Sequence, residues 1–449
     1  MMKLFKRFAV LLMIIALVVI SFGCSSAHDG YRAADGVGGY APSKIIDGAV
    51  GFDDEMLEVA PEGEYSAADD AETSVEEEVQ RPVGLITASA WNDNQYYDYY
   101  LTLFDEEKTE IGQNGEETTT KGKFRSYYEN ARWGFDNTSR VKVTVKAGET
   151  PAAGAVVTYF LQDQSKMSAV ADANGVCYIF PDTATGSVTV SSGSYSATAE
   201  FDAENRDLEV QLDGAVAKAA IIKLMFVVDV TGSMGDELNY LTAELDDVIK
   251  RVAAANGQID IDLAFLFYRD NGDKVKFDYY DFMGVTRQEN LTAQLNNLAK
   301  QRAEGGGDYP EALDEALEMA INKNWGNENS TKIIFHVFDA PPHEEKSNQA
   351  CYQRAARGAA AKGIRINPVL CSGADLLCEY LARQTAILTG GHFVYVTDDS
   401  GIGNAHYDPN IPNAVVERLN DLIVRLVDGY YTGEFADPVD WKTATAGNN

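Results

Sequence analysis

The feature that most constrains the fold is an apolar run that ends abruptly in side chains bearing oxygen atoms. Residues 223–237 read KLMFVVDVTGSMGDE, and 224–228 have the length and β-branched content of a buried strand. Asp229, Thr231 and Ser233 follow in alternation, so in an extended segment their oxygens can point the same way. A strand that ends in a polar loop and feeds a helix predicts an open α/β sheet with a ligand site at its carboxyl edge.

A helical pattern begins at Glu237, directly after this loop. Its apolar residues recur at helical spacing and predict one buried face, formed by Leu238, Leu241, Leu245, Val248, Ile249 and Val252. The carboxylate and the two hydroxyls of the preceding loop make half a coordination shell for a hard cation such as Mg²⁺. The sequence therefore predicts a divalent cation at the end of this strand.

The loop Asp229-x-Thr231-x-Ser233 on a buried strand resembles the metal-ion-dependent adhesion site (MIDAS) of von Willebrand factor type A domains. The resemblance covers about residues 217–432. It implies a doubly wound, Rossmann-like α/β fold with a mainly parallel sheet. It also implies that a bound divalent cation, Mg²⁺ or alternatively Mn²⁺ or Ca²⁺, meets an acidic group on a protein or envelope partner.

A second acidic loop, residues 304–311, reads EGGGDYPE and is predicted to open a helix at Pro310. In the family this loop usually offers a Thr to the metal. No Ser or Thr lies between Thr292 and Ser330, so Asp308 is assigned to that position. The alternative role for Asp308 is a cap of the helix that follows.

A third loop follows a predicted buried strand at residues 332–338 and begins with Asp339. Its position matches the third metal loop of type A domains. The resemblance therefore implies one metal site formed by Asp229, Thr231, Ser233, Asp308 and Asp339.

The rest of this region alternates strand and helix patterns, as a doubly wound sheet requires. Further strands are predicted at residues 259–267, 274–280, 364–370 and 392–396. Further helices are predicted at residues 291–300, at 348–362, from 374 onward and at 413–427.

A catalytic alternative exists for the first loop. The sequence DVTGS also resembles the aspartyl-phosphate loop of haloacid-dehalogenase-type phosphatases, in which the strand-end Asp, here Asp229, attacks phosphorus. The other loops fit that chemistry less well, and the sequence has no GxxxxGK[ST] phosphate loop. We therefore predict a binding protein rather than an enzyme, with a metal-dependent phosphohydrolase and a structural envelope spacer as alternatives.

Residues 1–23 are typical of an export signal, with Lys3, Lys6 and Arg7 ahead of an apolar run at 8–20. The Gly-Cys pair that ends the segment resembles a bacterial lipoprotein cleavage box, which implies a lipid on Cys24. An uncleaved signal anchor is the alternative. Either way the sequence predicts a membrane-anchored protein on the extracytoplasmic face of the cell membrane.

Residues 24–82 predict a disordered acidic linker, because 53–78 carry a dozen carboxylates without one Lys or Arg. The whole chain has 37 Lys and Arg against 69 Asp and Glu, a net charge of −32. Such a charge repels phosphate, which excludes nucleic acid as a partner.

The middle of the chain predicts two further units. Residues 83–138 are dense in aromatic side chains and predict a small subdomain. Residues 139–214 alternate apolar and polar side chains in about seven short runs, with a hairpin turn at Asn174-Gly175, and predict a small β-sandwich. This stretch resembles the carboxypeptidase-regulatory or transthyretin-like fold. Residues 433–449 are left as a C-terminal tail.

Four cysteines follow Cys24. Cys371 ends a predicted strand and Cys378 lies in the next helix, close enough in sequence to form a disulfide in an oxidising compartment. Cys177 lies in a β-run and is predicted to be a buried thiol.

Overall fold

One eight-stranded sheet organises the larger part of the structure, in the order β14-β13-β12-β15-β16-β17-β1-β18. The computed structural model describes residues 85–106, 108–111, 117–130, 133–255, 259–401, 405–409 and 411–446. All of them belong to one unit of the chain, Glu77–Asn449. The export signal, Cys24 and the acidic linker lie outside the described residues.

Five consecutive strands of the sheet are parallel, as predicted for a doubly wound fold: β12 (Ile221–Asp229), β13 (Asp260–Tyr268), β15 (Thr331–Phe338), β16 (Ile364–Leu370) and β17 (Phe393–Val396). β14 (Phe277–Gly284) pairs antiparallel with β13 at one end. β12 lies between β13 and β15, with Asp229 level with Tyr268 and Val228 level with Val337. The loops after these three strands therefore meet at one edge of the sheet.

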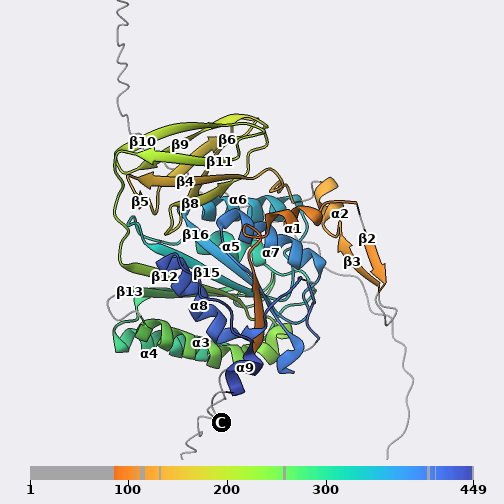
Figure 1. The fold of residues 1–449 in the computed structure, drawn as a ribbon. Helices are drawn as coiled ribbons and strands as arrows, with labels where there is room; N and C mark the ends of the chain where they lie inside the picture. Colours follow the sequence, from red (N-terminus) through yellow and green to blue (C-terminus); the bar gives the residue numbers. More distant parts are fainter. Residues whose placement is uncertain are drawn as a thin grey trace, which may run out of the picture. The chain divides into compact units, whose positions relative to one another are not determined.

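Helices cover both faces of the sheet (Figure 1). One face carries α3 (Gly235–Ala255), α4 (Gln288–Ala299) and α8 (Leu419–Thr432), and the other carries α1 (Tyr97–Thr102), α5 (Leu313–Ile321), α6 (Lys346–Lys362) and α7 (Leu376–Thr389). The predicted apolar face of α3 is buried at Leu238, Leu245, Val248, Ile249 and Val252, whereas the side chain of Leu241 lies outside the described residues.

Two helices begin three or more residues later than their sequence patterns predict. α5 begins at Leu313 instead of Pro310, because Glu311 instead forms a bridge with Pro342 in the third loop. α8 begins at Leu419, because β18 (Glu417–Arg418) pairs with β1 just before it. In both places a tertiary backbone contact overrides the local helical preference.

The aromatic segment is not a separate subdomain, which corrects the predicted boundaries at residues 83–138 and 217–432. β1 (Thr87–Trp91) pairs antiparallel with β17 and extends the main sheet. Aromatic side chains that follow it are buried in the same cluster as α5, α6 and α7, including Tyr100, Phe124, Trp133 and Phe135. The small elements β2 (Lys108–Ile111), β3 (Glu117–Lys121) and α2 (Arg125–Glu129) complete the segment. These residues were predicted as a subdomain because sequence periodicity does not show which sheet a short strand joins.

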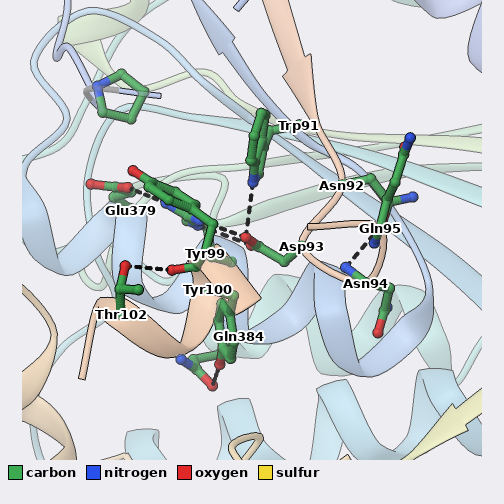
Figure 2. Close-up of polar contacts among 12 residues, drawn as sticks. Trp91, Asn92, Asp93, Asn94, Gln95, Tyr99, Tyr100, Thr102, Glu379 and Gln384 are labelled. Atoms are coloured by element: carbon green, nitrogen blue, oxygen red, sulfur yellow. Dashed lines mark hydrogen bonds and ion pairs between the residues drawn. The ribbon is translucent and has the colours of Figure 1, made fainter. Parts of the chain in front are cut away.

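A buried polar network fixes the end of β1 to α7. The indole of Trp91 donates to an Asp93 carboxylate oxygen at 3.0 Å, as Figure 2 shows. The Asp93 carboxylate also accepts from the Arg383 guanidinium at 2.9 Å, and Arg383 bonds Glu379 at 3.0 Å. All three charged side chains are essentially inaccessible to solvent.

Residues 141–212, here called the two-sheet region, form two smaller sheets that share one buried cluster. One sheet has the order β10 (Tyr195–Phe201), β9 (Gly186–Ser192), β6 (Val156–Phe160) and β7 (Lys166–Val170). The other joins β11 (Asp207–Leu212), β4 (Val141–Ala147) and β5 (Thr150–Pro151), with β8 (Val176–Ile179) also paired to β4. The region therefore holds eight strands, against about seven predicted.

The predicted hairpin at Asn174-Gly175 is a turn of a different kind, because it joins β7 to β8 and these belong to different sheets. Gly175 has a φ of +73°, and a Cβ there would lie 2.3 Å from the Val145 carbonyl oxygen. Turn chemistry was read correctly, but sequence alone does not show which strands a turn connects.

The predicted Cys371–Cys378 disulfide does not form. Both thiols are free and buried. Cys371 belongs to the cluster on the α3 face of the sheet and Cys378 to the cluster on the opposite face, so the sheet separates them. Cys177 is a buried thiol, as predicted.

The C-terminal tail contains a short helix, α9 (Trp441–Ala446). Across the described parts of the chain, no helix combines the length and the apolar character that crossing a membrane requires.

Candidate metal centre

The first loop brings Asp229, Thr231 and Ser233 together at the carboxyl end of β12. One carboxylate oxygen of Asp229 accepts from the Thr231 backbone N–H at 2.9 Å and from its hydroxyl at 2.7 Å. The Thr231 and Ser233 hydroxyl oxygens lie 3.3 Å apart. Asp229 and Thr231 are buried, whereas Ser233 is exposed, so the group opens toward solvent on the Ser233 side.

Asp339 joins the same group from the end of β15. Its side chain is 2% exposed. Burial raises the pKa of Asp339 to about 6, and the neighbouring Ser233 hydroxyl opposes this shift. The structure therefore brings four of the five predicted site residues together.

The fifth predicted residue, Asp308, does not belong to the group. It is exposed, and its charge is not among the main causes that shift the pKa of Asp229, Asp339 or Glu311. It does not cap α5 either, because the residue before that helix is Ala312. The carboxylate that the second loop contributes is Glu311, which is only 3% exposed.

Glu311 is held between the second and third loops. Its backbone N–H donates to the Pro341 carbonyl at 2.9 Å. Gly306 leaves room for its side chain, since a Cβ at that position would lie 2.9 Å from Glu311 Oε1. Gly306 also has a φ of +70°, which favours glycine. The sequence signal for Glu311 was an acidic residue at the end of EGGGDYPE, which was missed because the helix was expected to begin at Pro310.

Backbone hydrogen bonds tie the first loop to the second. Gly232 N–H donates to the Gly305 carbonyl at 3.1 Å, and Glu304 N–H donates to the Val230 carbonyl at 3.1 Å. The Asp273 carboxylate, in the loop after β13, accepts from Gly306 N–H at 3.0 Å. The three glycines of the second loop thus let its backbone approach the first loop closely.

The carboxyl groups of this site are difficult to ionise, because they are buried and lie near one another. Burial, followed by the charge of Asp339, raises the pKa of Asp229 to about 7. Burial, followed by the charge of Asp229, raises the pKa of Glu311 to about 9. The Tyr268 hydroxyl at the end of β13 partly lowers the pKa of Asp229, although no hydrogen bond of normal geometry joins the two.

Three oxygens of the group have no hydrogen-bond partner among the described residues: Asp229 Oδ2, Asp339 Oδ1 and Glu311 Oε2. Buried, unpaired carboxylate oxygens beside two hydroxyls are the donor set that a hard divalent cation requires. Within the described residues, no three His, Cys, Asp or Glu side chains lie close enough together to hold a metal ion. Hydroxyls and water would therefore supply the remaining ligands.

Residues 223–375 match the family model described as von Willebrand factor A domain. The chain contains a von Willebrand factor A domain. β1, β17 and α8 lie outside the matched residues but complete the sheet and core of this A domain.

Two curated proteins are similar to part of this chain. Alpha-protein kinase vwkA of Dictyostelium discoideum is 27% identical over 143 residues, which are 31% of this chain and 22% of the relative. An ariadne-like RING finger protein of Acanthamoeba polyphaga mimivirus is 32% identical over 133 residues, 29% of this chain and 12% of the relative. The chain thus spans less than a quarter of the length of either relative.

One solved structure that is similar to part of this chain is the pilus adhesin SpaC of Lactobacillus rhamnosus GG in its open conformation, with 11% sequence identity and a TM-score of 0.32. That match covers 46% of this chain and 29% of the adhesin. A von Willebrand factor type A protein from Catenulispora acidiphila matches at 11% identity and a TM-score of 0.29, over 54% of this chain and 46% of its own. At such TM-scores neither structure adds an argument to the family match.

Proposed function

We propose that the A domain binds a divalent cation, Mg²⁺ before Mn²⁺ or Ca²⁺, and through it an acidic group on a protein partner. The observation that carries this proposal is the set of three buried carboxylates, Asp229, Asp339 and Glu311, each with one oxygen that has no hydrogen-bond partner among the described residues. Their pKa values are raised, because ionising them in this buried site is costly. A bound cation would remove this cost by offsetting the buried charge.

Each residue of the group has a distinct role in this proposal. Asp229, Asp339 and Ser233 would hold the cation, and Glu311 would act directly or through water. Thr231 orients Asp229, because its backbone N–H and hydroxyl both bond the same carboxylate oxygen. A bound divalent cation supplies a ligand position that a partner's carboxylate can occupy.

The proposal extends to the setting of the domain. The export signal and the Gly-Cys pair support attachment through a lipid on Cys24, with the protein on the extracytoplasmic face of the cell membrane. The two-sheet region, whose sequence resembles the carboxypeptidase-regulatory fold, would serve as a β-sandwich spacer or binding module. The protein would act as an adhesion or interaction protein and not as an enzyme.

Calorimetric titration of the purified chain with Mg²⁺ and Mn²⁺ tests the proposal. We expect one site, which is lost in Asp229→Asn and retained in Asp308→Asn. The same preparations should then be assayed for phosphatase turnover. Turnover that requires Mg²⁺ and disappears in Asp229→Asn would establish the phosphohydrolase alternative instead, and an unchanged isotherm in Asp229→Asn would end the metal proposal.

A further inference from the structure

A cavity of about 690 Å³ opens between the A domain and the two-sheet region. Its walls include the first residues of β15 and β16, the last residue of α6, and parts of β6 and β7. It therefore lies at the amino-terminal edge of the main sheet. β15 has eight residues, so about 26 Å of strand separates this edge from the metal centre.

The cavity is positively charged in a chain that is strongly negative overall. Its lining contains five cationic side chains and two carboxylates. The cations come from five different places in the chain: Lys218, Lys323, Lys332, Lys362 and Arg365. In the whole chain, acidic residues outnumber basic ones by 69 to 37, so most of the surface is expected to be negative. The excess of cations at this cavity is the opposite of that overall balance.

Among the described residues, none of the five cations forms an ion pair within 4.0 Å. They contact aromatic rings, backbone carbonyls and one side-chain amide instead. Lys218 lies over the Tyr431 ring at 4.2 Å and donates to the Tyr431 carbonyl, and Lys323 lies over the Tyr279 ring at 3.9 Å. Lys332 donates to the Lys362 carbonyl at 3.4 Å, and Lys362 donates to the Ile321 carbonyl at 2.8 Å and to Asn322 Oδ1 at 3.4 Å. Arg365 donates to the Thr389 and Val170 carbonyls at 2.7 and 2.8 Å.

The two carboxylates of the lining are already engaged. Asp172 accepts from the backbone N–H groups of Asn174 and Val176 at 2.9 and 2.8 Å. Glu328 pairs with Lys223 at 3.1 Å, a residue outside the lining. Neither lining carboxylate therefore forms an ion pair with a cation of the cavity.

Two buried hydroxyls of the lining provide a second, independent sign of a ligand. Thr331 Oγ1 and Ser330 Oγ have no hydrogen-bond partner among the described residues, and Thr331 is only 8% exposed. Both residues line the cavity, and they come immediately before Lys332 in the sequence. Because these two hydroxyls have no partner among the described residues, each could donate to an oxyanion that reaches it.

We propose that this cavity binds a small polyanion carrying at least two carboxylate or phosphate groups. Ser330, Thr331 and Lys332 all line the cavity where β15 begins, and Lys218 lies on the link between the two-sheet region and the A domain. The volume is in the usual range for a small-molecule site. Burial lowers the pKa of Lys332 and lowers that of Lys218 to about 8, and the charges of Glu328 and Asp172 respectively oppose these two shifts.

Direct titration of the full chain in metal-free buffer tests this site, with inorganic pyrophosphate as the phosphate probe and citrate as the carboxylate probe. We expect saturable binding of at least one probe, and the stronger of the two identifies the chemistry. Lys332→Gln should weaken that binding on the order of tenfold. Lys166→Gln is the matched control, since Lys166 is exposed on β7 and outside the lining, and it should leave binding unchanged.

Thr331→Val adds a readout that depends on the unpaired hydroxyl. It should weaken probe binding several-fold while the thermal midpoint of the ligand-free chain stays equal or rises. If Lys332→Gln fails to fold, Lys362→Gln at an exposed position replaces it. Failure of both probes to bind at about 1 mM, or equal losses in Lys332→Gln and Lys166→Gln, would overturn the proposal. Because no metal is present, the outcome does not depend on the metal centre.

Discussion

Burial, followed by the charge of Asp229, raises the pKa of the Glu311 carboxyl to about 9. The two residues lie in different loops, and Asp339 adds a third carboxylate from the next strand. If all three ionise around one divalent cation, the local charge is about −1, where a site with a neutral second-loop ligand would sum to zero. The cation would be held more tightly by the protein, and it would attract a partner's carboxylate less strongly.

Glu311→Gln tests which second-loop residue serves the metal. We expect it to weaken Mg²⁺ binding by roughly 10–100-fold, because a carboxylate beside the ion is lost. Above about pH 9, where Glu311 ionises in the metal-free chain, it should also raise the thermal midpoint, because a buried like charge is removed. Calorimetry and thermal melts measure the two effects. The matched control is Asp308→Asn, and a larger loss of metal affinity there than in Glu311→Gln would mean that Asp308 is the second-loop residue that serves the metal.

Metal binding should depend on pH in a defined direction. Asp229, Asp339 and Glu311 must lose their protons to hold a cation, and their pKa values are about 7, 6 and 9. Mg²⁺ affinity should therefore rise between about pH 5 and pH 9, with release of protons on binding. Calorimetry in two buffers of different ionisation enthalpy measures that release. Affinity that is flat over this range would contradict the buried-carboxylate model.

The raised pKa of Asp229 also affects the stability of the metal-free chain. The folded-state pKa of Asp229 is raised, so its contribution to stability is fully present below about pH 4 and is lost as the pH rises through about 7. Melts of the chelated chain across this range should show the loss, and Mg²⁺ should restore it. In Asp229→Asn this part of the pH dependence should disappear.

Sequence reasoning succeeded where one strand and its own loop determine the geometry. The apolar run before Asp229 specifies β12, and the alternation of Asp229, Thr231 and Ser233 specifies the hydrogen-bonded group that follows it. Asp339 was also found, because buried parallel strands place their carboxyl ends at one edge.

It failed where the decisive contact comes from a distant segment. Glu311 turns inward because its backbone pairs with the third loop, and no local pattern records that bridge. β1 joins β17 although more than two hundred residues separate them, so the aromatic segment resembled an independent unit. Cys371 and Cys378 are close in sequence, but the sheet lies between their side chains.

His336 should make the protein sensitive to acid. Burial lowers its pKa to about 3, and its Nε2 has no hydrogen-bond partner among the described residues. Its contribution to stability is therefore present above about pH 6.5 and is lost as the pH falls toward 3, by about 2 kcal/mol at pH 5. We compare the free energy of unfolding, measured with urea, at neutral pH and at pH 5. It should fall by about 2 kcal/mol less in His336→Leu than in the unmodified chain. Equal slopes for both proteins between pH 6.5 and 5 would refute the assignment.

The network between β1 and α7 should contribute strongly to stability. Asp93→Ala leaves the Arg383 guanidinium buried with only Glu379 and removes the acceptor of the Trp91 indole. We expect a loss of about 3–5 kcal/mol in the free energy of unfolding, measured with urea. Asp98→Ala is the control, because Asp98 is exposed on α1, and its effect should stay within about 0.5 kcal/mol. Similar losses in both variants would rule out a specific role for the network.

A fragment of residues 217–432, the domain predicted from sequence, should not fold as well as a fragment of residues 85–446. The shorter fragment lacks β1, so β17 becomes an open edge and its backbone loses the pairing from Trp91 to Ala88. It also lacks Asp93, which leaves Arg383 buried without its main partner. Light scattering and thermal melts should show aggregation and a lower midpoint for 217–432, and adding a peptide of residues 85–106 should raise that midpoint. Equal midpoints for the two fragments would mean that β1 adds to the sheet without supporting it.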